Sequence, residues 1–136
     1  MRLVILFVIV LYSMSVQAVT GDWQLHLKNE QVEVYFKKSD CHDIANGIHQ
    51  EKILVKYINK TTEKLEISFL KAATYNGYTN TSAENSCTVV LEPNESREGI
   101  CSDRDKSLTI FSKHLDMEGV SLQAIDFRNM LIKTIR

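Results

Sequence analysis

The sequence has little proline, little glycine and almost no net charge. Its 136 residues include one proline, Pro93, and five scattered glycines, so no glycine-rich loop is available to cradle a phosphate group. The formal net charge is −1, whereas a nucleic-acid binder needs a clustered positive field to neutralise phosphates. We therefore expect no nucleic-acid partner. The chain also has no repeat of fixed period and no linker-like tract, which leaves a single domain.

Long apolar runs are absent except at the N-terminus. Arg2 supplies one positive charge, residues 3–11 are apolar, and the small residue Ala18 ends the segment. These features predict a secretory signal peptide at residues 1–18. The apolar run is shorter than the roughly 20 residues that a membrane-spanning helix needs, so an uncleaved anchor is the less favoured alternative. Residues 19–136 are then predicted to be one exported domain without a membrane span, located in the periplasm or outside the cell.

Alternating apolar and polar side chains predict a central hairpin at residues 53–69. Folding this stretch about its polar middle places Tyr57 opposite Leu65 and Val55 opposite Ile67. Cross-strand pairs of aromatic and β-branched side chains stabilise antiparallel strands. We expect a second sheet to cover the apolar face of this hairpin.

Shorter alternating runs predict the remaining strands, which would bring the total to about seven. Close turn signals between them are typical of an antiparallel β-sandwich. Trp23 is expected in the core, because large aromatic side chains provide much of the burial in a small sandwich. The last run also fits an amphipathic helix over residues 120–135, and this alternative stays open. The predicted strands cover residues 23–27, 32–36, 88–91, 108–112 and 122–127.

The pattern of strands and turns resembles that of small immunoglobulin-like domains in secreted bacterial proteins. The resemblance is carried by Ile53-x-Val55-x-Tyr57-x-Asn59-x-Thr61 and, after a further strand, by Leu91-x-Pro93-Asn94-Glu95-Ser96. It implies an immunoglobulin-like sandwich, and many such domains have no known activity. The chain lacks the Cys…Trp…Cys order of antibody-type domains, because its one tryptophan precedes all three cysteines. The resemblance therefore implies the sandwich and no immune function.

Three cysteines in a chain with an export signal predict one disulfide and one remaining thiol. Folding the chain about Asn94 places Cys87 opposite Cys101, which favours a Cys87–Cys101 bridge across a hairpin. Pairing of Cys41 with either of the others is the alternative, because spacing alone does not fix connectivity.

Side chains that could bind a metal or act in catalysis are densest at Cys41-His42-Asp43, with His49 nearby. Thiolate and imidazole ligands suit zinc or copper, but this spacing matches no closed four-ligand site. We interpret the segment as a solvated loop and predict no metal and no cofactor. No local motif distinguishes a nucleophile, so we also predict that the protein is not an enzyme.

The best candidate for a binding loop lies at residues 75–82, with Tyr75, Asn76, Tyr78 and Asn80 as its contact residues. Tyrosine gives rigid contact area, and Asn, Ser and Thr give adaptable hydrogen bonds, as in recognition loops on sandwiches. The simpler interpretation is a hairpin turn, since the pair Asn76-Gly77 favours a tight turn by itself.

Three sequons also fall in predicted turns, at Asn59, Asn80 and Asn94. They are candidate glycosylation sites if the chain passes through a eukaryotic secretory pathway.

Together these features predict an exported, non-catalytic binding or structural domain with a protein or glycan partner. The alternative is an accessory or inhibitor module of a secreted enzyme or envelope complex, acting through an exposed sheet edge. A small hydrolase is a weaker alternative.

Overall fold

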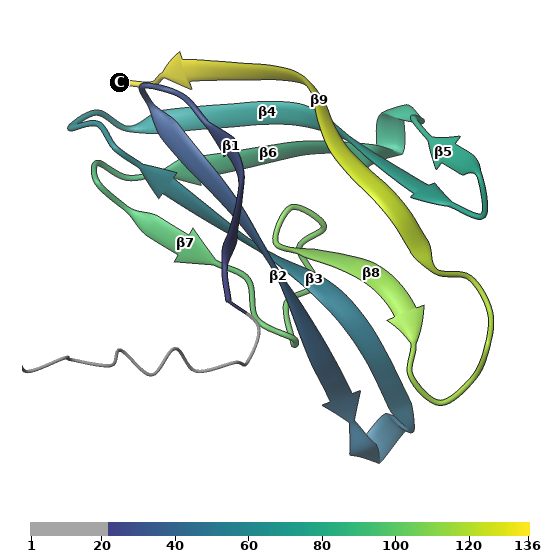
Figure 1. Cartoon of the computed structure of the whole chain (residues 1–136). Helices are drawn as coiled ribbons and strands as arrows, with labels where there is room; N and C mark the ends of the chain where they lie inside the picture. Colours follow the sequence, from purple (N-terminus) through teal and green to yellow (C-terminus); the bar gives the residue numbers. More distant parts are fainter. Residues whose placement is uncertain (1–21) are drawn as a thin grey trace, which may run out of the picture.

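The computed structural model describes residues 22–136, so the predicted signal peptide lies outside the described residues. They form two antiparallel sheets that pack face to face (Figure 1). This confirms the predicted all-β sandwich, although with nine strands instead of about seven. The elements are β1 (Gln24–Lys28), β2 (Val32–Asp43), η1 (Ile44–Asn46), β3 (Ile48–Asn59), β4 (Leu65–Tyr75), β5 (Tyr78–Asn80), η2 (Ala83–Asn85), β6 (Ser86–Leu91), β7 (Ser96–Glu98), β8 (Thr109–His114) and β9 (Leu122–Thr134).

Each sheet is built around one central strand. In the first sheet β3 pairs with β2 along one edge and with β7 and β8 in succession along the other, while β1 lies outside β2. In the second sheet β4 pairs with β9 on one side and with β6 and β5 on the other. Because β9 pairs with β4 from Leu122 to Thr134, the helical alternative for this segment is wrong. The immunoglobulin-like type stays a prediction.

The prediction of a central hairpin at residues 53–69 is wrong. Its two arms are β3 and β4, which lie in different sheets. Their apolar side chains do meet, but across the core: the ring centroids of Tyr57 and Phe69 are 6.4 Å apart. The connection at residues 60–64 is therefore an arch between sheets. The second predicted hairpin, about Asn94, is also an arch, from β6 in one sheet to β7 in the other.

The core contains the inward-facing side chains of both sheets. Trp23 is not among them, contrary to expectation: it is half-buried, and the amines of Lys37 and Lys56 lie 5.4 and 4.8 Å from its ring centroid. Leu25 is also exposed, because a bulge between Leu25 and Leu27 interrupts the alternation in β1. The fully buried hydrophobic side chains are Val32, Val34, Val55, Tyr57, Leu65, Ile67 and Leu91.

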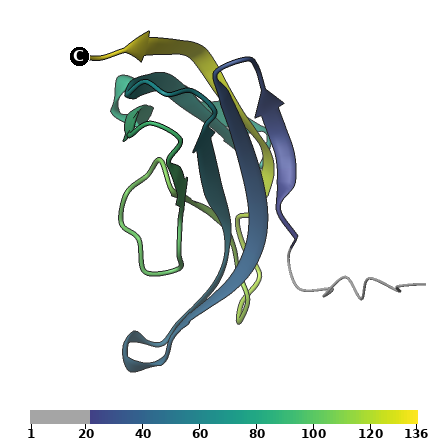
Figure 2. The ribbon, with the colours of Figure 1, turned by 90° about the vertical axis from the view of Figure 1, so that its left-hand side faces the viewer.

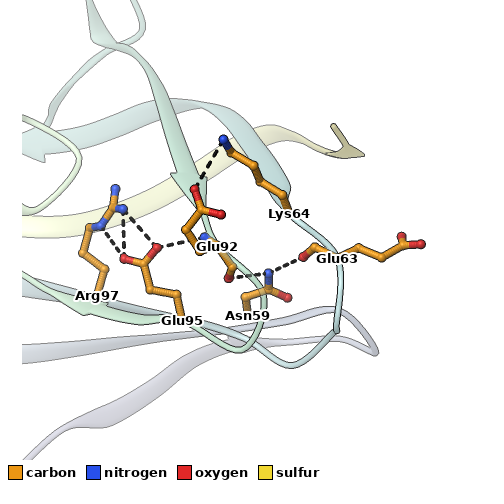
Figure 3. Close-up of polar contacts among 6 residues, drawn as sticks. All are labelled: Asn59, Glu63, Lys64, Glu92, Glu95 and Arg97. Carbon is orange, nitrogen blue, oxygen red and sulfur yellow. Dashed lines mark hydrogen bonds and ion pairs between the residues drawn. The ribbon is translucent and has the colours of Figure 1, made fainter. Parts of the chain in front are cut away.

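One buried amide joins the two arches at the same end of the sandwich. Asn59 is 1% exposed, and its Nδ2 donates hydrogen bonds to the carbonyl oxygens of Glu63 at 2.7 Å and Glu92 at 3.0 Å (Figure 3). Its Oδ1 accepts from the backbone and the hydroxyl of Thr61. The backbone of Asn59 also donates to the carbonyl of Glu95. Asn59 thus satisfies polar backbone groups of both arches, and its own buried amide has all its partners within the fold.

A carboxylate reinforces the second arch. Glu95 accepts a hydrogen bond from the backbone N–H of Glu92 at 2.8 Å. It also accepts hydrogen bonds from Nε and Nη2 of Arg97, at 3.0 and 2.9 Å (Figure 3). The backbone donor of Glu92 lowers the pKa of Glu95 below its ordinary value; desolvation partly opposes this shift, and Arg97 adds to it. This carboxylate therefore stays ionised while it holds the turn.

We predict that Asn59→Asp lowers the free energy of unfolding by about 3 kcal/mol or more. The variant keeps the shape of the side chain but places a carboxylate against two carbonyl oxygens that have lost their donor. Urea unfolding measures the change. Asn94→Gly is the matched control, because Asn94 is exposed with a φ of 57° that glycine adopts without strain. The role assigned to Asn59 is wrong if the two variants unfold at the same urea concentration.

Candidate functional site

Three connections lie at the end of the sandwich opposite the arches, where the β4–β5 turn stands apart from the tip of the β2–β3 hairpin (Figure 1). We name residues 43–48, 76–78 and 115–121 the loop end; they join β2 to β3, β4 to β5 and β8 to β9. The backbone N–H of Leu115 donates to the carbonyl of His49 at 3.0 Å, and that of Gly77 donates to Gln123 Oε1 at 2.6 Å. The β2–β3 hairpin extends furthest and projects beyond the sheets (Figures 1 and 2). These bonds attach the β8–β9 connection to the start of β3 and the β4–β5 turn to β9.

Exposed apolar side chains concentrate on the loop end. The described residues include nine large hydrophobic side chains that are exposed, and six of them lie here. Ile44 is 84% exposed, on the short helix η1 at the tip of the β2–β3 hairpin. The arch loops at residues 60–64 and 92–95 contain none of the nine. The six are Ile44, Ile48, Tyr78, Leu115, Met117 and Val120.

The disulfide joins Cys41 to Cys101, so the predicted Cys87–Cys101 bridge is wrong and the alternative pairing of Cys41 holds. The reason is the arch: Cys87 lies on β6 in one sheet, while the chain has crossed to the other sheet by β7, before it reaches Cys101. Cys87 is a free thiol, 3% exposed, and burial raises its pKa. The bridge instead attaches the 99–108 connection to the long strand β2, beside the loop end.

Alkylation of the unfolded, unreduced protein should modify Cys87 alone, and a peptide map should link the Cys41 and Cys101 peptides. The bridge closes a loop of 60 residues, so its removal in Cys41→Ser/Cys101→Ser should destabilise the fold by about 4 kcal/mol through unfolded-state entropy. Mass spectrometry and urea unfolding provide the two measurements. Modification at Cys41 would contradict the observed pairing.

A pocket of about 690 Å³ lies beside this disulfide. Its walls are the tip of the β2–β3 hairpin and the turn that follows Cys101. Ile44 and Ile48 give it apolar surface, and charged and amide groups surround them, a composition that suits a mixed polar and apolar ligand surface. The lining residues are Cys41, His42, Asp43, Ile44, Asn46, Ile48, Gln50, Lys52, Cys101, Ser102, Asp103 and Arg104.

A second pocket, of about 620 Å³, lies between the first sheet and β9 of the second. Beside it, a bridge between Lys113 and Ser121 brings the start of β9 close to the end of β8. Phe36, Ile53 and Ile125 are among its apolar lining residues. The imidazole of His26 stacks on Phe36, with ring centroids 4.1 Å apart, and burial lowers the pKa of His26 although Asp126 partly opposes the shift. The bulge in β1 brings this histidine against the rings of Phe36 and Phe127.

This histidine should make stability depend on pH. Its pKa is about 6.5 in the unfolded chain and lower in the folded chain, so the unfolded state binds more protons as the pH falls below about 6.5. The free energy of unfolding therefore decreases in acid. His26→Phe keeps an aromatic stack and should reduce the loss of stability between about pH 7 and pH 5, measured by urea unfolding. Asp126→Asn should enlarge that loss, and an identical pH dependence in all three proteins would refute the assignment.

The predicted binding loop is an ordered hairpin turn. Asn76 and Gly77 have φ values of 49° and 77°, which confirms the predicted tight turn. The hydroxyl of Tyr75 donates to the carbonyl of Phe111 at 2.6 Å, so this tyrosine packs between sheets. Asn80 is half-buried and accepts a hydrogen bond from the backbone of Ser82. Tyr78, 74% exposed, is the aromatic side chain of this loop that is free to touch a partner.

The three sequons differ in access. Asn59 is buried, and the nitrogen that a glycan would occupy donates two hydrogen bonds, so the fold has no room for a glycan there. Asn80 is half-buried in β5, whereas Asn94 is exposed at the tip of an arch.

The predicted solvated loop at Cys41-His42-Asp43 is instead the end of β2 and its turn. Cys41 is oxidised and unavailable as a thiolate ligand. Within residues 22–136 no group of three or more His, Cys, Asp or Glu side chains is placed to hold a metal ion. His42 and His49, however, are direct cross-strand partners. Their symmetric positions about the η1 turn were the signal in the sequence for this contact.

Comparisons with protein-family models, with curated proteins and with solved structures find no match to this chain. Among residues 22–136 there is no helix with the length and hydropathy of a membrane span. The disulfide fits a periplasmic or extracellular location, where thiols are oxidised.

Proposed function

We propose that this chain is an exported, non-catalytic binding module that contacts a partner protein through its loop end. The observation that carries the proposal is the concentration there of six of the nine exposed large hydrophobic side chains of the described residues. Monomeric proteins rarely keep large contiguous apolar patches in water unless the patch has a partner.

The chemistry of these side chains favours a protein over a glycan. Five of the six are aliphatic or methionine, and methionine is enriched at the buried centres of protein interfaces. Tyr78 is the one aromatic among them, while sugar recognition relies on flat aromatic faces and dense hydrogen bonding. The charged residues Asp43, Asp116 and Glu118 supply a polar rim.

The loops also carry a low entropic penalty for binding. The disulfide at Cys41, the bond from Leu115 to His49 and the bond from Gly77 to Gln123 hold each connection in place. A surface that is already ordered loses less conformational freedom when it is covered.

The accessory or inhibitor module is the second candidate, and β9 is the observation in its favour. Among residues 22–136 this 13-residue strand pairs with β4 alone, so its other edge could accept an added strand. Two register shifts interrupt its pairing, and one bulge includes Asn129 in a left-handed conformation. Bulges of this kind hinder strand addition, which places this candidate second.

A photoreactive amino acid should distinguish the surfaces. We expect it to form one discrete protein adduct in the native secretion when it replaces Met117 at the loop end, and none when it replaces Glu63 at an arch. In the Met117 probe, the further change Val120→Asp should abolish the adduct without changing the melting temperature, because it charges the patch at an exposed position. Gel mobility and mass spectrometry detect the product.

Other outcomes of the same experiment would contradict the loop-end proposal. An adduct only from a probe at Lys133 on β9 would favour the sheet-edge candidate. No adduct from Met117, or equal adducts from Met117 and Glu63, would overturn the loop-end proposal.

A further inference from the structure

Two histidines face each other at the base of the projecting hairpin tip. His42 on β2 and His49 on β3 are direct cross-strand partners, and their Nδ1 atoms lie 2.8 Å apart. Their ring centroids are 5.1 Å apart, with the rings tilted by 55°. In this contact one Nδ1 donates and the other accepts, so the lone pair of at least one ring is directed at its neighbour.

The spacing is close to that of two imidazoles bound to one metal ion. Imidazole nitrogens bind transition metals at about 2.0–2.1 Å, so two of them at right angles stand about 2.9 Å apart. A tetrahedral angle would require about 3.3 Å by the same geometry. Right angles between ligands are typical of Cu(II) and Ni(II), and Cu(II) is the stronger binder in the divalent series.

We propose that His42 and His49 form a two-histidine site for Cu(II), in which the metal displaces the shared proton and binds both Nδ1 atoms from beside the line that joins them. Each ring then carries its proton at Nε2, and each Nδ1 is a ligand. The described residues offer no third ligand to the pair. The remaining positions of the metal are therefore filled by water or by a group from outside the chain, which makes this an open and exchangeable site.

The surrounding charges favour a cation. Asp40 and Glu51 form the next cross-strand pair on the same face of the hairpin, two residues along each strand. Glu51 is held by a hydrogen bond from the hydroxyl of Ser112 at 2.8 Å. Two carboxylates near the imidazoles raise the local concentration of a divalent ion.

The backbone around the pair is fixed before any metal binds. Cys41, adjacent to His42, is held by the disulfide, and the carbonyl of His49 accepts the backbone bond from Leu115. Two ligands on a rigid frame act as a chelate, so the second imidazole binds at a high effective concentration. The proposal stands apart from the proposed function, since it requires no partner protein.

The test is a titration of the full exported chain, without a histidine tag, with CuCl₂ in a non-chelating buffer. Calorimetry and the visible absorption of nitrogen-bound Cu(II) should show one site. His42→Ala and His49→Ala should each weaken binding about a hundredfold, because a single imidazole loses the chelate advantage. His114→Ala is the matched control and should leave the affinity unchanged, since His114 contacts Phe111 and no second histidine.

Acid should also release the metal, because a ligating imidazole must be neutral. His42 is exposed and His49 is half-buried outside the hydrophobic core, so neither substitution removes core packing, and circular dichroism checks that the variants fold. The proposal is overturned if the unmodified chain binds no Cu(II), if both single variants keep its affinity, or if His114→Ala weakens binding as much as they do.

Discussion

The packing of the two sheets depends on the buried amide of Asn59. The chain crosses between sheets twice at one end, and each crossing removes backbone groups from a strand ladder. A single side chain with two donors and an acceptor with two lone pairs satisfies groups in both crossings, and its own backbone bonds to Glu95. The lysine after it donates its backbone N–H to Gln31, so the β1–β2 turn joins the same network. An apolar residue of similar size would fill the space but leave these carbonyls unsatisfied in a low dielectric.

This constraint explains which parts of the fold the sequence could predict. Period-two alternation identified most strands and, except in β1 where a bulge interrupts it, their inward sides, because burial imposes that pattern directly. It could not distinguish a hairpin from an arch. In both arrangements Tyr57 and Leu65 face the same interior, and the difference lies in whether the backbones pair or stand in opposite sheets. The residue that decides is Asn59, which in the sequence looks like an ordinary turn residue and a sequon.

The disulfide prediction failed for the same reason. Symmetry about Asn94 placed Cys87 opposite Cys101 only on the assumption of a hairpin, and the arch separates them. The long-range pairing with Cys41 depends on β2 continuing through a polar stretch that has no apolar alternation. Its polar side chains remain in a strand because the full-length partner β3 and the disulfide hold them there. At the candidate site, the tight turn at Asn76-Gly77 was predictable from local conformation, whereas the placement of three loops at one end required the whole topology.

The connections at the two ends of the sandwich are thus held in place in different ways. At the arch end the chain crosses between the two sheets, and its polar groups form hydrogen bonds within the protein. Glu95 and Arg97 belong to this network. At the loop end the connections are held by a disulfide and a few backbone bonds, so side chains there are not needed for closure. Ile44, Met117 and Val120 contribute little to the core because they point into solvent. The fold gains little core packing from these apolar side chains, which agrees with the proposal that a partner covers them.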